Sequence, residues 1–119
     1  MNNSSKILIC GSRNWHDRDK IIERFKTIST NSIIIHGGCN GADSISGEIA
    51  STLGISEMCY PANWKEFGRS ASPRRNQQML DEGKPDLVIV FHEDLQNSRG
   101  TLDMMKRAKK SGVIIEIIS

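Results

Sequence analysis

Long apolar runs, paired cysteines and a large excess of charge are all missing from this sequence of 119 residues. No apolar run approaches the roughly 18 residues of a membrane-spanning helix, and the stretch from Met1 to Lys6 is too polar for a signal peptide. Cys10, Cys39 and Cys59 follow no disulfide spacing, which indicates reduced thiols in a cytoplasmic protein. The net charge of +2 excludes a strongly basic DNA-coating protein but not a local cationic pocket.

What is present indicates one globular domain. Hydrophobic residues make up 37% of the chain and charged residues 25%, an ordinary composition that argues against disorder. Short apolar runs predict five strands, at 6–10, 32–36, 55–60, 86–91 and 113–118. Helical spacing predicts four helices, at 17–28, 43–53, 73–82 and 98–111. We expect a disordered tail at residues 1–5 and a single ligand-binding domain at 6–119.

The alternation of strands and helices predicts an α/β, Rossmann-like fold with a parallel sheet between two helical layers. The runs 33–35, 87–91 and 113–115 are continuous, as expected of strands covered on both faces. Right-handed crossovers favour the strand order 3-2-1-4-5. Ligands of such sheets bind beyond the carboxyl ends of the strands, where the order reverses between strands 1 and 4. The loops that matter are therefore 11–16, 37–42, 61–72 and 92–97.

The loop after the second strand, HGGCNGAD, places three glycines before a helix. Gly37, Gly38 and Gly41 would let the backbone approach a phosphate at the helix start, although a tight turn explains the same glycines. The spacing GGxxG matches neither the Rossmann nor the Walker pattern. Asp43 is expected to cap the helix or, if it faces a ligand, to bind ribose hydroxyls rather than phosphate.

Arginines occupy the starts of two predicted helices, where the helix dipole disfavours each cation by about 0.3–1 kcal/mol. Arg74, Arg75 and Arg99 all lie in first turns. The simplest explanation is an anion that both the arginines and the helix ends bind, and Arg13 of the first loop would add a fourth cation. The alternative is a set of salt bridges to nearby acids, namely Glu66, Asp94 or Asp103.

Polar and aromatic side chains extend this pattern. Ser98 is expected to cap the last helix and Thr101 to donate its hydroxyl to an anion, so that two helix N-termini would point at one crevice. Trp15 and Trp64 lie in or beside the loops after strands 1 and 3, where a ring would stack on a nucleobase. For Trp64 and Phe67 the alternative is to close one end of the core.

Metal and nucleophile chemistry find little support in the sequence. Cys10, His36, Cys59 and His92 fall near strand ends, but their spacing matches no zinc pattern. A serine hydrolase is not favoured either, because no GxSxG motif is present. We therefore expect no metal and no cofactor.

Four ordered motifs carry a family resemblance: GSRNW, HGGCNGAD, YPANWKEFGRSASPRRNQQML and NSRGT. They resemble the YspA-like branch of the SLOG superfamily, which is named after the DNA-uptake protein Smf/DprA and the plant enzyme Lonely Guy. The resemblance covers 6–119 and implies a Rossmann-like domain that binds nucleotides or nucleotide-derived molecules. It also implies two kinds of relative: sensors of nucleotide signals in bacterial defence, and hydrolases that cleave the N-glycosidic bond of nucleoside 5′-monophosphates.

The hydrolase motif, PGGxGTxxE, is only partly matched by the stretch NSRGTLDM. Gly100 and Thr101 match its GT, but the glutamate position falls on Met104. Asp103 lies one residue early, and a helical neighbour points about 100° away. The resemblance also places the hydrolase arginine at Arg75. The residues that would bind the anion are therefore present, while the catalytic carboxylate of the hydrolases is absent, and this favours ligand binding over turnover.

The leading prediction is a protein that senses or sequesters a phosphorylated, nucleotide-derived small molecule, such as a defence signal. Its expected ligand-binding residues are Gly11, Ser12, Arg13, Trp15, Gly37, Gly38, Gly41, Asp43, Trp64, Arg75, Asn76, Ser98, Arg99, Gly100 and Thr101. One alternative is a nucleotide N-glycosidase that uses Asp43 or Asp103 as its carboxylate. Another is single-stranded DNA binding, but the near-neutral charge makes a nucleic-acid partner unexpected.

A homo-oligomer is expected on two grounds. Related hydrolases are dimers, and the apolar last strand, VIIEII, is predicted to lie at an exposed edge of the sheet.

Overall fold

The computed structural model of the protein describes residues 5–119 and contains one sheet of five parallel strands. The strands are β1 (Lys6–Gly11), β2 (Ile33–His36), β3 (Ser56–Cys59), β4 (Leu87–Phe91) and β5 (Ile114–Ile118). Their spatial order is β3-β2-β1-β4-β5, and every neighbouring pair is parallel. The predicted strand order and the parallel sheet are confirmed.

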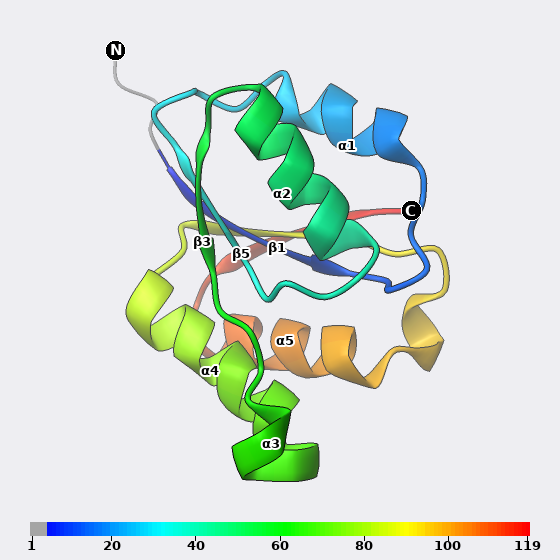
Figure 1. The fold of residues 1–119 in the computed structure, drawn as a ribbon, viewed down its shortest axis with the longest axis vertical. Coiled ribbons are helices and arrows are strands. Elements are labelled where there is room, and N and C mark those ends of the chain that lie inside the picture. The colour runs from blue at the N-terminus through cyan, green and yellow to red at the C-terminus, as the bar shows by residue number, and fades with distance from the viewer. Residues whose placement is uncertain (1–4) are drawn as a thin grey trace.

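Helices cover both faces of this sheet (Figure 1). On one face lie α1 (Arg18–Phe25) and α2 (Ala42–Thr52), and on the other lie α4 (Ala71–Gly83) and α5 (Arg99–Lys110). A short helix α3 (Trp64–Phe67) and two 3₁₀ turns, η1 (Gly68–Ser70) and η2 (Leu95–Asn97), fill the connections. The predicted three-layer α/β architecture is thus confirmed. None of the helices in residues 5–119 combines the length and the apolar character that crossing a bilayer requires.

The core consists of two apolar clusters, one on each side of the central strands. Ile9 of β1 packs with Phe25 of α1 on the first side, and Leu8 packs with Met79 of α4 and Met104 of α5 on the second. Burial of one such side chain stabilises the fold by roughly 1.5–3 kcal/mol. Because both faces of β1 and β4 are covered, their carboxyl ends are held rigidly, and this edge carries the site described below.

Helices cover the edge strand β5 less completely than its continuous run of apolar residues led us to expect. Ile114 is 71% exposed and Ile117 51% exposed. The predicted exposed edge is confirmed, since β5 pairs with β4 alone and forms one border of the sheet. Coverage on both faces was therefore wrong for 113–115, because helices pack over the middle of the sheet rather than its border.

Three of the four predicted helices begin within one residue of the expected position, and one begins two residues early. The helix expected at 73–82, with Ser72 as its cap, begins at Ala71 because turn η1 leads directly into it, so Ser72 and Pro73 lie inside its first turn. Ser98 does cap α5, since its Oγ accepts the N–H of Thr101 at 3.3 Å.

The expected tail, 1–5, lies outside the described residues except for Ser5. The carbonyl oxygen of Ser5 accepts the N–H of Ile33, and its N–H donates to Ser32.

Candidate functional site

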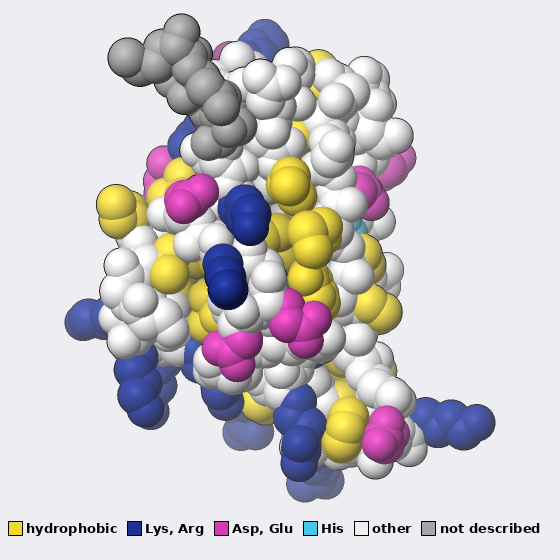
Figure 2. Space-filling view, turned by 90° about the vertical axis from the view of Figure 1, so that its left-hand side faces the viewer, with side chains coloured by type: hydrophobic (Ala, Val, Ile, Leu, Met, Phe, Trp, Pro, Cys, Tyr) yellow, Lys and Arg dark blue, Asp and Glu magenta, His cyan; other side chains and the backbone are white. Residues whose placement is uncertain are grey.

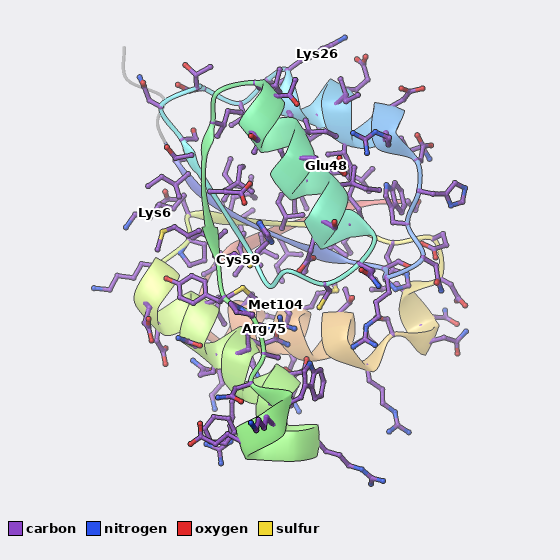
Figure 3. All side chains as sticks on the ribbon, in the orientation of Figure 1. Lys6, Lys26, Glu48, Cys59, Arg75 and Met104 are labelled. Carbon is purple, nitrogen blue, oxygen red and sulfur yellow. The ribbon has the colours of Figure 1, made fainter. Side chains whose placement is uncertain are left out.

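A cavity of about 520 Å³ opens at the carboxyl ends of β1 and β4, where the strand order reverses. Its wall comes from the end of β1, from the loops after β1, β2 and β4, from the start of α2, and from the N-terminal parts of α4 and α5. Figure 3 shows Arg75 of α4 and Met104 of α5 between the sheet and these helices, and both line the cavity. Ten predicted site residues lie on this wall: Gly11, Ser12, Arg13, Asp43, Arg75, Asn76, Ser98, Arg99, Gly100 and Thr101.

Arg75 is the buried cation of this wall, with only 7% of its surface exposed. Its guanidinium donates to neutral acceptors only: the carbonyl oxygens of Gly37 (2.8 Å) and Tyr60 (3.4 Å), Asn76 Oδ1 (3.1 Å), Ser72 Oγ (3.4 Å) and Cys39 Sγ (3.6 Å). Within residues 5–119 no carboxylate forms an ion pair with it. The guanidinium is therefore held in place without a bonded counter-ion.

Two more arginines reach the same cavity. Arg13 and Arg99 are exposed side chains on its wall, and neither forms an ion pair with another described residue. Arg74 turns elsewhere, because its guanidinium lies over the Phe67 ring at 4.5 Å. In the space-filling view, Lys and Arg side chains project from the end of the molecule that carries α3, α4 and α5 (Figure 2).

The predicted alternative, salt bridges from these arginines to nearby acids, is not what the described residues show. Asp103 binds Arg107 at 2.8 Å and also accepts from Asn76, while Asp94 accepts from Asn97. Glu66 Oε2 accepts the side-chain amide of Asn63, and the backbone N–H of Glu66 donates to Asn63 Oδ1. Each of the three acids therefore has other partners.

Asp43 lies on the cavity wall, but its hydrogen bonds point into the protein. Gly41, with φ 77°, takes the N-cap position of α2, so the expected cap at Asp43 was wrong. Oδ2 of Asp43 instead accepts the N–H of Gly37 at 2.9 Å, and the N–H of Cys39 also donates to this carboxylate. Burial raises the pKa of Asp43, against the opposing effects of these bonds and of the nearby Arg75. Asp43 therefore fixes the loop after β2.

The glycines of that loop lie behind the cavity and not on its wall. A Cβ on Gly37 would overlap the guanidinium of Arg75, and one on Gly41 would overlap the backbone of Ser12. The first N–H of α2, from Ala42, donates to the carbonyl oxygen of Ser12 at 3.0 Å. The predicted phosphate bed of Gly37, Gly38 and Gly41 was therefore wrong, because these glycines permit close packing and the helix start is already occupied.

The start of α5 is different, because it opens directly into the cavity. Ser98, Arg99, Gly100 and Thr101 all line it. Ser98 takes the N–H of Thr101, but the N–H groups of Arg99 and Gly100 come too early in the helix to find a partner inside it. Thr101 Oγ donates to the carbonyl oxygen of Gly11 at 3.3 Å, so its hydroxyl proton is committed to the fold. One open helix N-terminus, rather than the two expected, faces the cavity.

Neither predicted stacking ring lies on the cavity wall. Trp15 is 5% exposed, packs on Phe91 with ring centroids 5.7 Å apart, and donates its indole N–H to the carbonyl oxygen of Asp17. Trp64 is 50% exposed on α3 and is not among the residues that line the cavity. The stacking role for Trp15 was wrong, because its ring completes the core beneath α1.

Buried sulfur-containing side chains occupy the inner part of the cavity wall. Met104 is 1% exposed and Met79 2%, and Cys10 lies beside them at the end of β1. Burial raises the pKa of the Cys10 thiol, which therefore stays neutral. Met104 faces the cavity at the position where the resemblance places a glutamate, whereas Asp103 faces α4 and does not line it. No group of three potential metal ligands gathers in residues 5–119.

Ten residues of the wall were not predicted: Cys10, Asn14, Cys39, Ser72, Met79, His92, Glu93, Asp94, Asn97 and Met104. Most of them lie in the four loops that the strand order singled out, so position was the signal that could have found them. Glu93 is the most informative. Ser12 Oγ donates to its Oε1 at 2.7 Å, and this bond lowers the pKa of Glu93.

Comparison with known proteins now identifies the family. The YspA, cpYpsA-related SLOG family (YAcAr) matches residues 5–67, which is more than half of the chain. The chain belongs to this family. The Gene 61 protein of Mycobacterium phage D29 is 30% identical over an alignment of 117 positions, which covers 91% of this chain and 91% of that protein. The predicted YspA-like SLOG membership is confirmed.

A solved structure supports the same fold. The X-ray structure of DNA processing protein A (DprA) from Streptococcus pneumoniae is similar with a TM-score of 0.77 over 98% of this chain. The two sequences are 18% identical, so the likeness concerns the fold alone. The chain spans about half of the length of DprA. Membership of the SLOG family points to a nucleotide-related function on this Rossmann-like fold.

Proposed function

We propose that the protein binds a phosphorylated, nucleotide-derived small molecule in the cavity at the carboxyl edge of the sheet, and so senses or sequesters it. One observation carries this proposal: Arg75 is 93% buried beside a cavity of about 520 Å³ and hydrogen-bonds only neutral groups. A buried charge is costly unless an opposite charge lies near it. Asp43 is close, but its carboxylate accepts backbone N–H groups of the loop after β2 and forms no ion pair with the guanidinium among the described residues. A bound anion would supply the missing charge.

The remaining parts of the wall suit a phosphate group. Arg99 and Arg13 bring two further cations, and the N–H groups of Arg99 and Gly100 lie at the positive end of the α5 dipole. The apolar inner wall at Met79 and Met104 suits the base. In this arrangement the phosphate lies at the start of α5 and the base lies deeper.

Binding without turnover is favoured by the positions of the two carboxylates that the sequence offered for catalysis, Asp43 and Asp103. Hydrolysis of an N-glycosidic bond needs a carboxylate placed to stabilise charge or activate water. Met104 stands at the position where the hydrolases carry glutamate, and Asp103 faces away from the cavity. Asp43 accepts two backbone N–H groups and is buried. An N-glycosidase built on Asp43 or Asp103 is therefore the weaker proposal.

The first experiment identifies the ligand. Heat denaturation of the purified protein, followed by mass spectrometry of the supernatant, should release a phosphorylated nucleotide derivative. Calorimetric titration of the ligand-free protein with that compound should then give a 1:1 complex. Chromatography of the mixture should show no free base. Release of base that Asp43→Asn abolishes would overturn binding without turnover, and a protein that binds no nucleotide would overturn the proposal itself.

A matched pair of variants tests the place of binding. Arg99→Ala removes a cavity cation and should weaken binding about tenfold, since a hydrogen bond to a charged group contributes about 1.5–3 kcal/mol. Arg69→Ala removes an exposed arginine of turn η1 that does not line the cavity, and should leave the affinity unchanged. Equal losses in both variants would indicate a diffuse electrostatic effect. A steep dependence on salt, together with retention of single-stranded DNA, would indicate nucleic-acid binding instead.

A further inference from the structure

Three carboxylates line a cavity whose other charged groups are arginines, and they differ in what remains free on each. Asp43 accepts the N–H groups of Gly37 and Cys39 and is buried. Asp94 accepts the side-chain amide of Asn97 on Oδ2 at 2.8 Å. Glu93 and Asp94 are both exposed, and in residues 5–119 each keeps one oxygen without a side-chain donor. Asp94 is held by the exposed Asn97 of its own segment, whereas Glu93 is held by the buried Ser12 of the loop after β1. Glu93 is therefore the fixed carboxylate of the wall that can accept a hydrogen bond from a ligand.

The position of Glu93 is fixed by a buried serine. Ser12 is 4% exposed, and its Oγ accepts the N–H of Asn14 at 3.0 Å while donating to Glu93 Oε1 at 2.7 Å. A serine hydroxyl has a single proton, so this proton is directed at Glu93. The hydrogen bond also lowers the pKa of Glu93, which keeps the carboxylate ionised and able only to accept.

An ionised carboxylate in an anion-binding cavity repels phosphate and must face a hydrogen-bond donor of the ligand. Glu93 is bonded to Ser12, the neighbour of Arg13, and it lies in the loop that leads to Arg99 at the start of α5. Glu93 is thus tied to the two segments that carry the exposed cations of the wall. In a nucleotide the ribose joins the phosphate to the base, so the donors next to a phosphate are the ribose hydroxyls.

We infer that Glu93 accepts a hydrogen bond from the ribose hydroxyls of the ligand and makes the site selective for ribonucleotides over 2′-deoxyribonucleotides. This inference rests on the proposed function. The sequence suggested that Asp43 binds the ribose hydroxyls, and the inference assigns this role to Glu93 instead. The Asp43 carboxylate already accepts two N–H groups of the loop after β2. A site built to bind a hydroxyl discriminates strongly against the analogue that lacks it, because its acceptor is then left unpaired.

The test is calorimetric titration of the full chain with the four ribonucleoside 5′-monophosphates, their 2′-deoxy counterparts and inorganic pyrophosphate. The wild-type protein should prefer ribonucleotides by about tenfold or more, the range of a hydrogen bond to a charged group. Glu93→Gln should reduce the preference to about twofold or less, because an amide accepts more weakly than a carboxylate. The same variant should bind pyrophosphate at least as well as the wild type, since a repelling charge is gone.

Two further variants keep this test specific. Ser12→Ala removes the hydrogen bond that holds Glu93 and should lower the preference for ribonucleotides part of the way. Glu23→Gln neutralises an exposed carboxylate of α1 outside the cavity and should leave the preference intact. Melting temperatures of the three variants should match the wild type within a few degrees, so that a changed preference reflects the site and not the fold.

Three results would overturn the inference. Full retention of the ribonucleotide preference in Glu93→Gln would exclude Glu93 as the discriminating group. A loss confined to nucleotides with an exocyclic amino group, which sparing of UMP would reveal, would place Glu93 against the base. Binding of nucleotides by the wild type with no preference for ribose would reject the inference alone. Failure to bind every nucleotide and pyrophosphate would instead reject the proposed function, and the inference with it.

Discussion

Two loops at the same edge of the sheet behave in opposite ways. The loop after β2, at 37–41, carries the conspicuous glycines, yet its polar groups are satisfied inside the protein by Asp43, Arg75 and the carbonyl oxygen of Ser12. The segment after β4, at 92–101, looks ordinary in sequence, yet it brings eight of its residues to the cavity wall. The loop after β2 reaches the wall only through Cys39 and otherwise supports it from behind, whereas the segment after β4 presents groups to a ligand.

This difference shows that a glycine-rich strand-to-helix turn has two physical uses. Glycine allows a ligand to approach the backbone, or it allows another part of the chain to do so. Here the chain itself occupies the space, since side chains at Gly37 and Gly41 would overlap Arg75 and Ser12. Free N–H groups at a helix start, and not glycines, therefore distinguish the open loop from the closed one.

The largest expected effect comes from adding one methyl group to each loop. Gly41→Ala should lower the free energy of unfolding by about 3–5 kcal/mol, because φ is 77° and the new Cβ would overlap the backbone of Ser12. Gly100→Ala is the matched change in the open loop. Its nearest neighbour would be Ser72 Oγ at 4.0 Å, so stability should change by about 1 kcal/mol or less. Urea denaturation of both variants measures the contrast, and equal losses would remove the distinction between the loops.

Removal of the Asp43 carboxylate, which holds the loop after β2, should have the next largest effect on stability. Asp43→Ala leaves two inward-facing N–H groups, those of Gly37 and Cys39, without their acceptor, and should destabilise the protein by about 2–4 kcal/mol. Asp43→Asn keeps one acceptor and should lose about half as much. Chemical denaturation measures both values, and equal stability of Asp43→Ala and the wild type would show that water replaces the carboxylate.

The direction of the pH effect follows from the raised pKa of Asp43. The folded state binds this proton more tightly than the unfolded chain, in which the pKa is near 3.8. The stability that this bound proton contributes is therefore complete below that value and is lost as the pH rises through the raised pKa. In Asp43→Asn, this part of the pH dependence should vanish from stability curves measured between acid and neutral pH.

Substitutions of Arg75 and Arg99 should differ in their effect on stability, although both should weaken ligand binding. Arg75→Ala should destabilise the protein by about 2–4 kcal/mol and also weaken ligand binding, because the guanidinium bonds the carbonyl oxygens of Gly37 and Tyr60. Arg99→Ala should leave stability within about 0.5 kcal/mol of the wild type, as expected for an exposed side chain. Thermal melting with and without ligand separates the two effects. Unchanged stability in Arg75→Ala would contradict its structural part.

Much of the fold could be predicted from the sequence, because strand runs and helical spacing record burial directly. The five strands, the sheet order and the cap at Ser98 follow from such local signals. The extra turn at Ala71 could not be predicted, because it depends on η1 continuing into α4. The exposure of β5 also depends on how far the helices reach across the sheet.

The site was predicted less completely, and for a different reason. Arg75 and Arg99 were found because the sequence predicted both in the first turn of a helix, against its dipole. That placement holds for Arg99, but α4 begins at Ala71 and puts Arg75 in its second turn. The inward turn of Trp15 and the engagement of Asp43 with Gly37 depend on long-range packing, which no local pattern records. Glu93 was not predicted, because an exposed loop glutamate carries no sequence signal for its hydrogen bond to Ser12, which is distant in the sequence.

The smallest expected effect lies in the open segment and concerns the charge of Glu93. Ser12→Ala removes the hydrogen bond that lowers its pKa, so the pKa should rise toward the ordinary value of 4.5. In the wild type, a lowered carboxyl pKa adds stability that is present above the ordinary value and is lost as the pH falls through the folded one. Because the side chain is exposed, this change in stability should be too small to detect, while the titration of the carboxyl carbon by NMR should move clearly.

Ser51→Ala, at an exposed serine of α2, should leave the titration in place. A pKa of Glu93 that is the same in Ser12→Ala and the wild type would mean that the carboxylate is free in solution, and the open loop would then lack a fixed acceptor for its ligand.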